Sequence, residues 1–212
     1  MASKRDDTSW FPRFGDIPGV AWTPPAGVDR RKIRGHDVRP EKNDWGSDSV
    51  WWPSLEPGEE GGSTSATPAQ QYVGLDWSEA KTVAAVLRNM AEALELPGNP
   101  SDYHFIMAGA QERLWKLRQT DPAAVREVER LCWLDVELVR ARPEIIAPYH
   151  EDEPHLYMEV LNVLYRLYQR EGYLAEAEQI AAMAVNEFHQ RFERQLDEAR
   201  ERRAVLEAED AA

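Results

Sequence analysis

The chain has 212 residues, with 25 lysines and arginines against 38 aspartates and glutamates, so its formal net charge is −13 at pH 7. This acidic balance argues against a nucleic-acid-binding face, because a phosphate backbone would be repelled. Cys132 is the only cysteine, which excludes an intramolecular disulfide, and the sequence opens without a signal peptide and holds no apolar stretch of membrane-spanning length. We therefore expect a cytoplasmic protein with no membrane contact.

Residues 1–70 are predicted to form a mostly disordered arm and linker, because they hold most of the prolines and glycines and lack helical periodicity. The arm is nevertheless rich in tryptophan, and its two aromatic motifs, around Trp10 and at Trp51 and Trp52, each include a proline. Either the arm packs back over a groove of its own helices, or Trp10, Trp51 and Trp52 anchor it on another protein.

A short basic cluster in the arm is the strongest cationic feature of the sequence. It consists of Arg30, Arg31, Lys32 and Arg34. Short charge runs of this kind are usually solvated loops. The alternative is that the cluster touches nucleic acid, in a chain whose helical part acts as a regulatory module.

Residues 71–212 are predicted to be an all-α domain, because apolar residues recur at helical spacing between clear start and stop signals. The first helix is expected to begin at Asp76 and to end before Pro97. Asn99 followed by Pro100 begins the second helix, and Asp121 followed by Pro122 begins a third that runs to about residue 142. Gly109 lies inside the second helix, where a glycine indicates close packing rather than a phosphate loop.

A fourth and a fifth helix fold back on each other around Gly172. The first carries large apolar residues and the second carries alanines, which allow the two backbones to approach closely. The residues at these positions are Leu161, Leu164, Tyr165, Tyr168, Gly172, Tyr173, Ala177, Ala181 and Ala184. This pattern resembles a tetratricopeptide repeat over residues 157–189, except that His189 stands where that family has its closing proline.

The predicted architecture is a stack of about five helices in antiparallel hairpins, a fragment of a tetratricopeptide-like solenoid. The second and third helices repeat in the fourth and fifth with a shift of 50 residues, longer than the period of about 34 in that family. The last helix is expected to continue from Ala175 to about Glu207, since no glycine or proline interrupts it. It either caps the stack or pairs with a second copy of the chain as a short coiled coil.

A row of polar residues between the core positions is the candidate binding surface. On the fourth helix the row is Glu159, Asn162, Arg166 and Gln169, and one unit earlier it is Glu112, Lys116 and Gln119. The resemblance implies that an extended peptide binds along this inner face, where amide and guanidinium groups suit a peptide backbone or carboxylate. The alternative is that the row is simply the solvated face of an amphipathic helix.

The loop before residue 154 holds the one cluster of metal-capable side chains, His150, Glu151, Asp152, Glu153 and His155. Acidic residues ahead of a helix are typical of capping, and no further histidine pair or cysteine accompanies them, so neither a metal nor another cofactor is predicted. A metal-dependent enzyme using this loop is the least favoured interpretation.

These observations favour a non-enzymatic adaptor or scaffold that binds another protein or an extended peptide through the helical groove and the tryptophan-bearing arm. Two alternatives stay open: a peptide-sensing regulatory module associated with transcription, and an assembly component of a larger complex.

Overall fold

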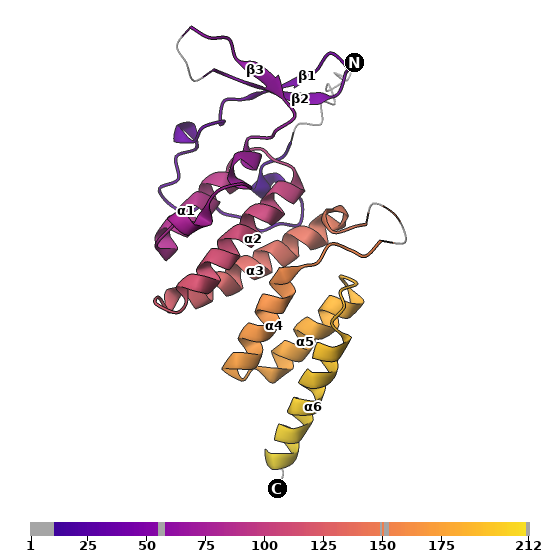
Figure 1. Ribbon diagram of the computed structural model, residues 1–212. Helices are drawn as coiled ribbons and strands as arrows, with labels where there is room; N and C mark the ends of the chain where they lie inside the picture. The colour runs from indigo at the N-terminus through magenta and orange to yellow at the C-terminus, as the bar shows by residue number, and fades with distance from the viewer. Residues whose placement is uncertain (1–10, 55–57, 149, 151–152, 211–212) are drawn as a thin grey trace. The chain divides into compact units, whose positions relative to one another are not determined.

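The computed structural model describes residues 11–54, 58–148, 150 and 153–210, and the chain divides into two compact units, Met1–Ala124 and Val125–Ala212 (Figure 1). In the described residues there are six α-helices and a sheet of three short strands. The fold is therefore mostly helical, as the sequence predicts, but it is not all-α. None of the described helices is both long and apolar enough to cross a membrane.

The first unit combines an antiparallel sheet with a helical pair. The strands are β1 (Arg39–Lys42), β2 (Asp48–Trp52) and β3 (Gly62–Thr64), in the order β1-β2-β3. The helices α1 (Val83–Leu94) and α2 (Pro100–Leu117) pack against each other. Short 3-10 turns lie before the sheet, at Phe14–Asp16 and Arg30–Lys32, and between the sheet and α1, at Ala69–Tyr72 and Trp77–Glu79.

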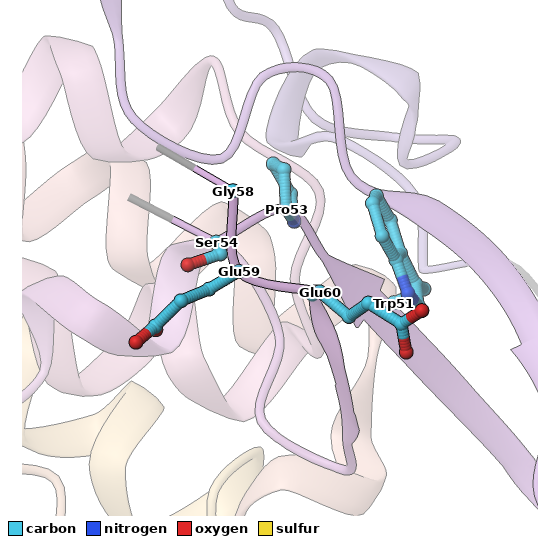
Figure 2. A pocket seen from close by; sticks show the side chains of 7 residues that line it. Trp51, Pro53, Ser54, Gly58, Glu59 and Glu60 are labelled. Carbon is cyan, nitrogen blue, oxygen red and sulfur yellow. The ribbon is translucent and has the colours of Figure 1, made fainter. Parts of the chain in front are cut away.

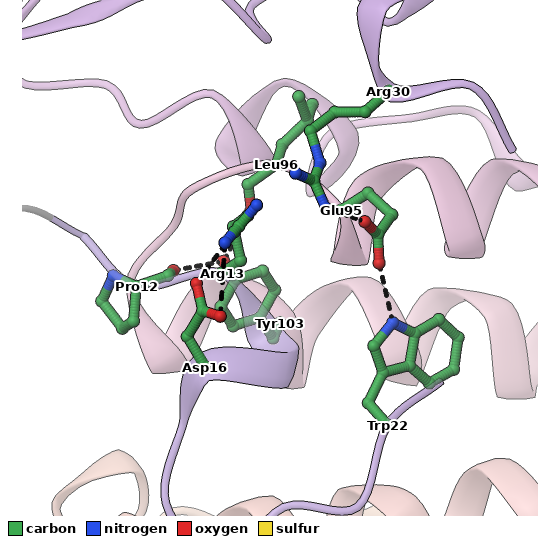
Figure 3. A network of polar contacts seen from close by, with 8 residues as sticks. All are labelled: Pro12, Arg13, Asp16, Trp22, Arg30, Glu95, Leu96 and Tyr103. Atoms are coloured by element: carbon green, nitrogen blue, oxygen red, sulfur yellow. Dashed lines mark hydrogen bonds and ion pairs between the residues drawn. The ribbon is translucent and has the colours of Figure 1, made fainter. Parts of the chain in front are cut away.

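The expected disorder of the arm is wrong for its described residues, because its aromatic side chains are used in packing. Phe14 is fully buried and meets the rings of Trp22 and Tyr103 edge-on, at centroid distances of 5.8 and 5.4 Å. Figure 3 shows that the Tyr103 hydroxyl also reaches the main chain of the arm, 2.6 Å from the carbonyl oxygen of Pro12. The arm therefore lies on the helical pair of its own unit, as the first of the two interpretations expects.

Glu95, just after α1, holds the arm in place with polar contacts (Figure 3). Its carboxylate accepts hydrogen bonds from Trp22 Nε1 at 3.0 Å and from the guanidinium of Arg30 at 2.6 Å. The Glu95 side chain is only 8% exposed, so it has lost most of its water, and these hydrogen bonds compensate for that loss.

The first α-helix begins later than the sequence predicts. Asp76 does act as a cap, accepting from the Ser78 amide at 3.0 Å, but only for the 3-10 turn Trp77–Glu79. The α-helix begins after Thr82, whose hydroxyl accepts from the Ala85 amide at 3.2 Å. Between these two caps the chain turns so that Trp77 packs on Gly109, where an added Cβ would lie 2.3 Å from the indole nitrogen.

The predicted starts of the second and third helices are confirmed. Asn99 and Asp102 form a capping box at the start of α2, and the Asp102 carboxylate also accepts from the hydroxyl of Thr67 at 2.7 Å. The third helix, α3 (Ala123–Ala141), follows Asp121, whose carboxylate accepts from the Ala123 amide at 3.0 Å. A 3-10 turn, Pro143–Ile145, follows it.

The second unit contains the predicted hairpin around Gly172. Its helices are α4 (Glu159–Glu171) and α5 (Leu174–Asn186), and Gly172 has φ 83°, the left-handed conformation that ends a helix. Most of the predicted core positions of α4 and α5 are buried, while Tyr168 is half-buried; the buried ones are Leu161, Leu164, Tyr165, Ala177, Ala181 and Ala184.

The prediction of one unbroken terminal helix is wrong, because the chain turns between Asn186 and α6 (Glu193–Asp210). The turn contains His189 at φ 53° and is fixed by the buried side chain of Gln190. Gln190 Oε1 accepts from the Met158 amide at 2.9 Å, and its Nε2 donates to the carbonyl oxygens of Leu156 and Phe188. The Gln190 side chain thus ties the turn to the segment before α4, while backbone amides, among them that of Gln190, bond to the last carbonyl groups of α5.

The new helix, α6, packs along α5. Leu196 and Ala199 are buried, and Glu178 of α5 receives ion pairs from Arg200 at 3.3 Å and Arg203 at 2.6 Å. Further along, Val205 and Leu206 are about half exposed. The first part of α6 therefore covers α5, as the capping interpretation requires, and pairing with a second copy stays a prediction.

Candidate functional site

Two side chains of the predicted polar row on α4 form hydrogen bonds with other residues of the same helix. Asn162 donates from Nδ2 to Glu159 Oε1 at 3.0 Å, and Gln169 donates from Nε2 to the hydroxyl of Tyr165 at 2.6 Å. Glu159 and Arg166 are exposed. The residues do lie on one helix at successive turns, but Asn162 is bonded within the row and Gln169 is bonded to the core residue Tyr165.

The earlier row, on α2, belongs to the other unit. Glu112 and Lys116 are exposed and form an ion pair of 2.5 Å, and Gln119 is exposed just beyond the end of the helix. An exposed pair one helical turn apart is typical of a solvated helix face. Peptide binding by either row stays a prediction.

The three predicted aromatic anchors differ in their surroundings. Trp10 lies outside the described residues. Trp52 packs against Gly35, and its Nε1 donates to the carbonyl oxygen of Ala66 at 3.3 Å, so it has a structural role. Trp51, its neighbour on β2, points to the opposite side of the sheet, where it lines a hollow.

The hollow beside Trp51 is about 620 Å³ in volume (Figure 2). It is lined by Trp51, Pro53, Ser54, Gly58, Glu59, Glu60 and Gly61. Gly61 permits the close approach of this loop to the ring, since an added Cβ would lie 2.4 Å from Trp51 Cζ2. The volume is in the range of small-ligand sites, and the lining combines one aromatic ring with two carboxylates.

The turn between β1 and β2 presents a tryptophan that the sequence analysis did not single out. Trp45 is 90% exposed. The turn around it is fixed by Asn43, whose side-chain oxygen accepts from the amides of Trp45 at 3.0 Å and Ser47 at 2.9 Å. Gly46, at φ 76°, donates from its amide to the Asn43 carbonyl oxygen at 2.8 Å. The Asn43 and Gly46 turn signals flanking an aromatic residue could have identified this feature.

The basic cluster of the arm is engaged within its own unit. Arg30 pairs with Glu95, and Arg31 and Lys32 lie 3.4 and 3.8 Å from the carboxylate of Asp29. The guanidinium of Arg34 lies over the Trp52 ring, 5.7 Å from its centroid. These contacts tie the cluster to its own unit, and contact of the cluster with nucleic acid stays a prediction.

The structure describes only part of the loop with metal-capable side chains, because Glu151 and Asp152 lie outside the described residues. Within the part that is described, no group of three or more histidine, cysteine or acidic side chains could hold a metal ion. The ring of His155 instead lies beside that of His189, with their centroids 5.0 Å apart.

The strongly shifted ionisable groups are packing residues rather than parts of the hollow. Burial raises the pKa of the Cys132 thiol, and burial with the nearby Asp102 raises the pKa of Tyr103. Burial and a hydrogen bond to Glu129 raise the pKa of Tyr168 to about 12. The Tyr168 hydroxyl also accepts from Trp133 Nε1 at 3.1 Å, so it joins α3 to α4.

Comparisons of the chain with protein-family models, with curated proteins and with solved structures found no match. The tetratricopeptide resemblance of residues 157–189 therefore stays a prediction made from the sequence.

Proposed function

We propose that this protein is a non-enzymatic adaptor that binds another protein, and that Trp45 on the β1–β2 turn is a principal anchor of that contact. The observation that carries the proposal is the 90% exposure of the Trp45 side chain. Tryptophan is enriched among the residues that dominate binding energy in protein interfaces.

The turn fixes the backbone that carries the exposed ring. Four backbone and side-chain hydrogen bonds link Asn43 with Trp45, Gly46 and Ser47, at 2.8 to 3.0 Å. A ring carried on a fixed turn requires no further ordering of the backbone when it binds, so more of its burial energy contributes to affinity. In the free chain the same ring contributes little to the core, because it is almost completely in water.

The test is quantitative affinity capture with the full chain and its Trp45→Ala variant, followed by titration of each captured protein with both purified chains. We expect at least one partner whose affinity falls by tenfold or more in the variant, because truncating an interface tryptophan typically costs 2 kcal/mol or more, as an order of magnitude. The variant should unfold at the same urea concentration as the parent.

Phe105→Ala on α2 is the matched control, since Phe105 is also an exposed aromatic residue, at 45%. It should leave the Trp45-dependent partner unaffected. If every partner binds the parent and the Trp45→Ala chain equally, Trp45 is not an anchor and the proposal loses its main support.

A further inference from the structure

Two histidine rings lie side by side in the second unit, where the turn between α5 and α6 meets the segment that leads into α4. The ring centroids of His155 and His189 are 5.0 Å apart, and the rings are tilted by 43°. His155 is half-buried and His189 is exposed, so an ion in water can reach both rings. Neutral imidazole is a common ligand of zinc, nickel and copper ions.

The backbone on both sides of this pair is fixed by the side chain of Gln190, which is only 5% exposed. This side chain bonds to the amide of Met158 at 2.9 Å and to the carbonyl oxygens of Leu156 at 3.1 Å and Phe188 at 3.0 Å. The two chain segments that carry the histidines are therefore held together before any ion arrives. A preformed pair of ligands loses less conformational freedom on binding than a pair that must first be assembled.

The backbone conformation of His189 is a second observation that singles out its side chain. Its φ is 53°, and it is the one residue other than glycine with a positive φ in the described part of the chain. Glycine adopts this left-handed conformation without steric cost, whereas residues with a Cβ are strained there. Strain of this kind recurs at functional sites. The turn thus carries an imidazole at a position where glycine would be less strained.

The separation of the two rings matches that of two imidazoles bound to one ion. A zinc–nitrogen bond is about 2.0–2.1 Å long, so each ring centroid lies roughly 3.2 Å from the ion. At a nitrogen–zinc–nitrogen angle of about 90–110°, two such centroids are roughly 4.5–5.2 Å apart. The distance of 5.0 Å lies in this range, and rotation about the Cβ–Cγ bond lets each ring turn a nitrogen toward the ion.

We propose that His155 and His189 bind zinc or a related divalent transition-metal ion. Each imidazole supplies one nitrogen, and water fills the remaining positions, because no group of three or more histidine, cysteine or acidic side chains lies together in the residues that the structure describes. The bound ion links the turn before α6 to the segment before α4. The site is independent of the proposed adaptor function, since it lies in the second unit and needs no partner protein.

The experiment uses the full chain without a polyhistidine tag, stripped of metal with a chelator that is then removed. Zinc is titrated into the chain by isothermal calorimetry. We expect a dissociation constant of roughly 1–200 µM, because two ligands provide about half of the binding free energy of a four-ligand zinc site. Magnesium, which prefers oxygen ligands, should not displace the zinc.

His155→Asn and His189→Asn each remove one ligand. Asparagine tolerates a left-handed backbone better than most residues, so the turn should keep its shape in the second variant. Either substitution should raise the zinc dissociation constant by about tenfold or more, because one imidazole provides only half of the ligand set. His36→Asn is the matched control, since His36 is also an exposed histidine, and it should bind zinc as the parent does.

Two further measurements locate the ion and show its effect. In the ¹⁵N-labelled chain, zinc should shift the amide signals of residues 155–158 and 188–191 together. Zinc should also raise the urea concentration at which the parent unfolds, because an ion that binds only the folded chain stabilises it. Without zinc, the two single variants should unfold close to the parent, and zinc at the same concentration should stabilise them less.

Unchanged zinc affinity in either single variant would show that the two rings do not share an ion. Absence of binding below about 1 mM zinc would likewise rule out the site, because the two ligands would then contribute too little to hold an ion. Neither result affects the comparison of the parent with Trp45→Ala. The Trp45→Ala chain should bind zinc as the parent does, whatever becomes of its partner.

Discussion

The indole nitrogen of Trp22 donates to the carboxylate of Glu95 across 73 residues of sequence, at 3.0 Å, and so joins the arm to the end of the first helix. Glu95 also accepts from Arg30, so one buried carboxylate fixes two points of the arm. The arm is thereby part of the first unit rather than an appendage to it.

Replacing this carboxylate should loosen the arm. Glu95→Leu leaves the Trp22 N–H and the Arg30 guanidinium without their acceptor, and we expect a loss of about 1–3 kcal/mol in the free energy of unfolding, measured by urea denaturation. Glu95→Gln, which keeps one acceptor, should lose less. Glu112→Gln removes an exposed carboxylate from an i,i+4 pair and should change stability by no more than about 0.5 kcal/mol. If all three variants changed the free energy of unfolding equally, Glu95 would not anchor the arm.

Gly109 should not tolerate a methyl group, although alanine is the better helix former. In Gly109→Ala the new Cβ would lie 2.3 Å from Trp77 Nε1, so the indole must move. We expect a net destabilisation of about 1–3 kcal/mol despite a helix-propensity gain of up to about 1 kcal/mol. Gly74→Ala is the control, since nothing lies within 4 Å of its added Cβ. Stabilisation by Gly109→Ala in thermal melts would contradict the packing of Trp77.

Gln190 should control the turn between α5 and α6. In Gln190→Leu the buried amide of Met158 loses its acceptor, which costs about 1–3 kcal/mol. Hydrogen exchange of the Met158 amide should accelerate in this variant. Gln119→Leu changes the same residue type at an exposed position and should leave that exchange rate unchanged. Unaltered protection of Met158 in Gln190→Leu would show that other contacts hold the turn.

Cys132 should react with thiol reagents only after unfolding, because it is fully buried and burial raises its pKa. The folded thiol keeps its proton while the unfolded thiol ionises around its ordinary pKa of about 8.5–9. Its contribution to stability is therefore complete below that range and falls as the pH rises through it. Urea midpoints of the parent chain should decline more steeply above pH 9 than those of Cys132→Ala. Rapid labelling of the native chain at pH 7 would show that the thiol is accessible.

The helical part of the fold could be predicted because its signals are local. Asn99, Asp121 and Gly172 each act on the backbone within a few residues, and each functions in the structure as its pattern indicates. The turn at Gln190 could not be predicted in the same way. Its bonds go to Leu156 and Met158, more than 30 residues earlier, and no local pattern in the sequence records them.

The arm is a second part of the fold that local sequence patterns could not predict. Its proline and glycine content indicates disorder, and only the tryptophans suggest that it needs a surface. The surface on which the arm packs is set by Glu95 and Tyr103, and both residues are distant from the arm in sequence. At the candidate hollow, the predicted anchor Trp51 is present, but Glu59 and Glu60 lie in a stretch that the sequence describes only as a linker.

The sequence separation between the arm and the residues that it contacts also has a consequence during protein synthesis. Tyr103 lies 91 residues after Pro12, so the ribosome must add that many residues before the hydroxyl can meet its carbonyl. At about 5–20 residues per second, Phe14 waits roughly 4–18 s for Tyr103, and Trp22 waits roughly 4–15 s for Glu95. During translation these two aromatic rings are thus exposed, and open to chaperones, before the residues that will bury them exist.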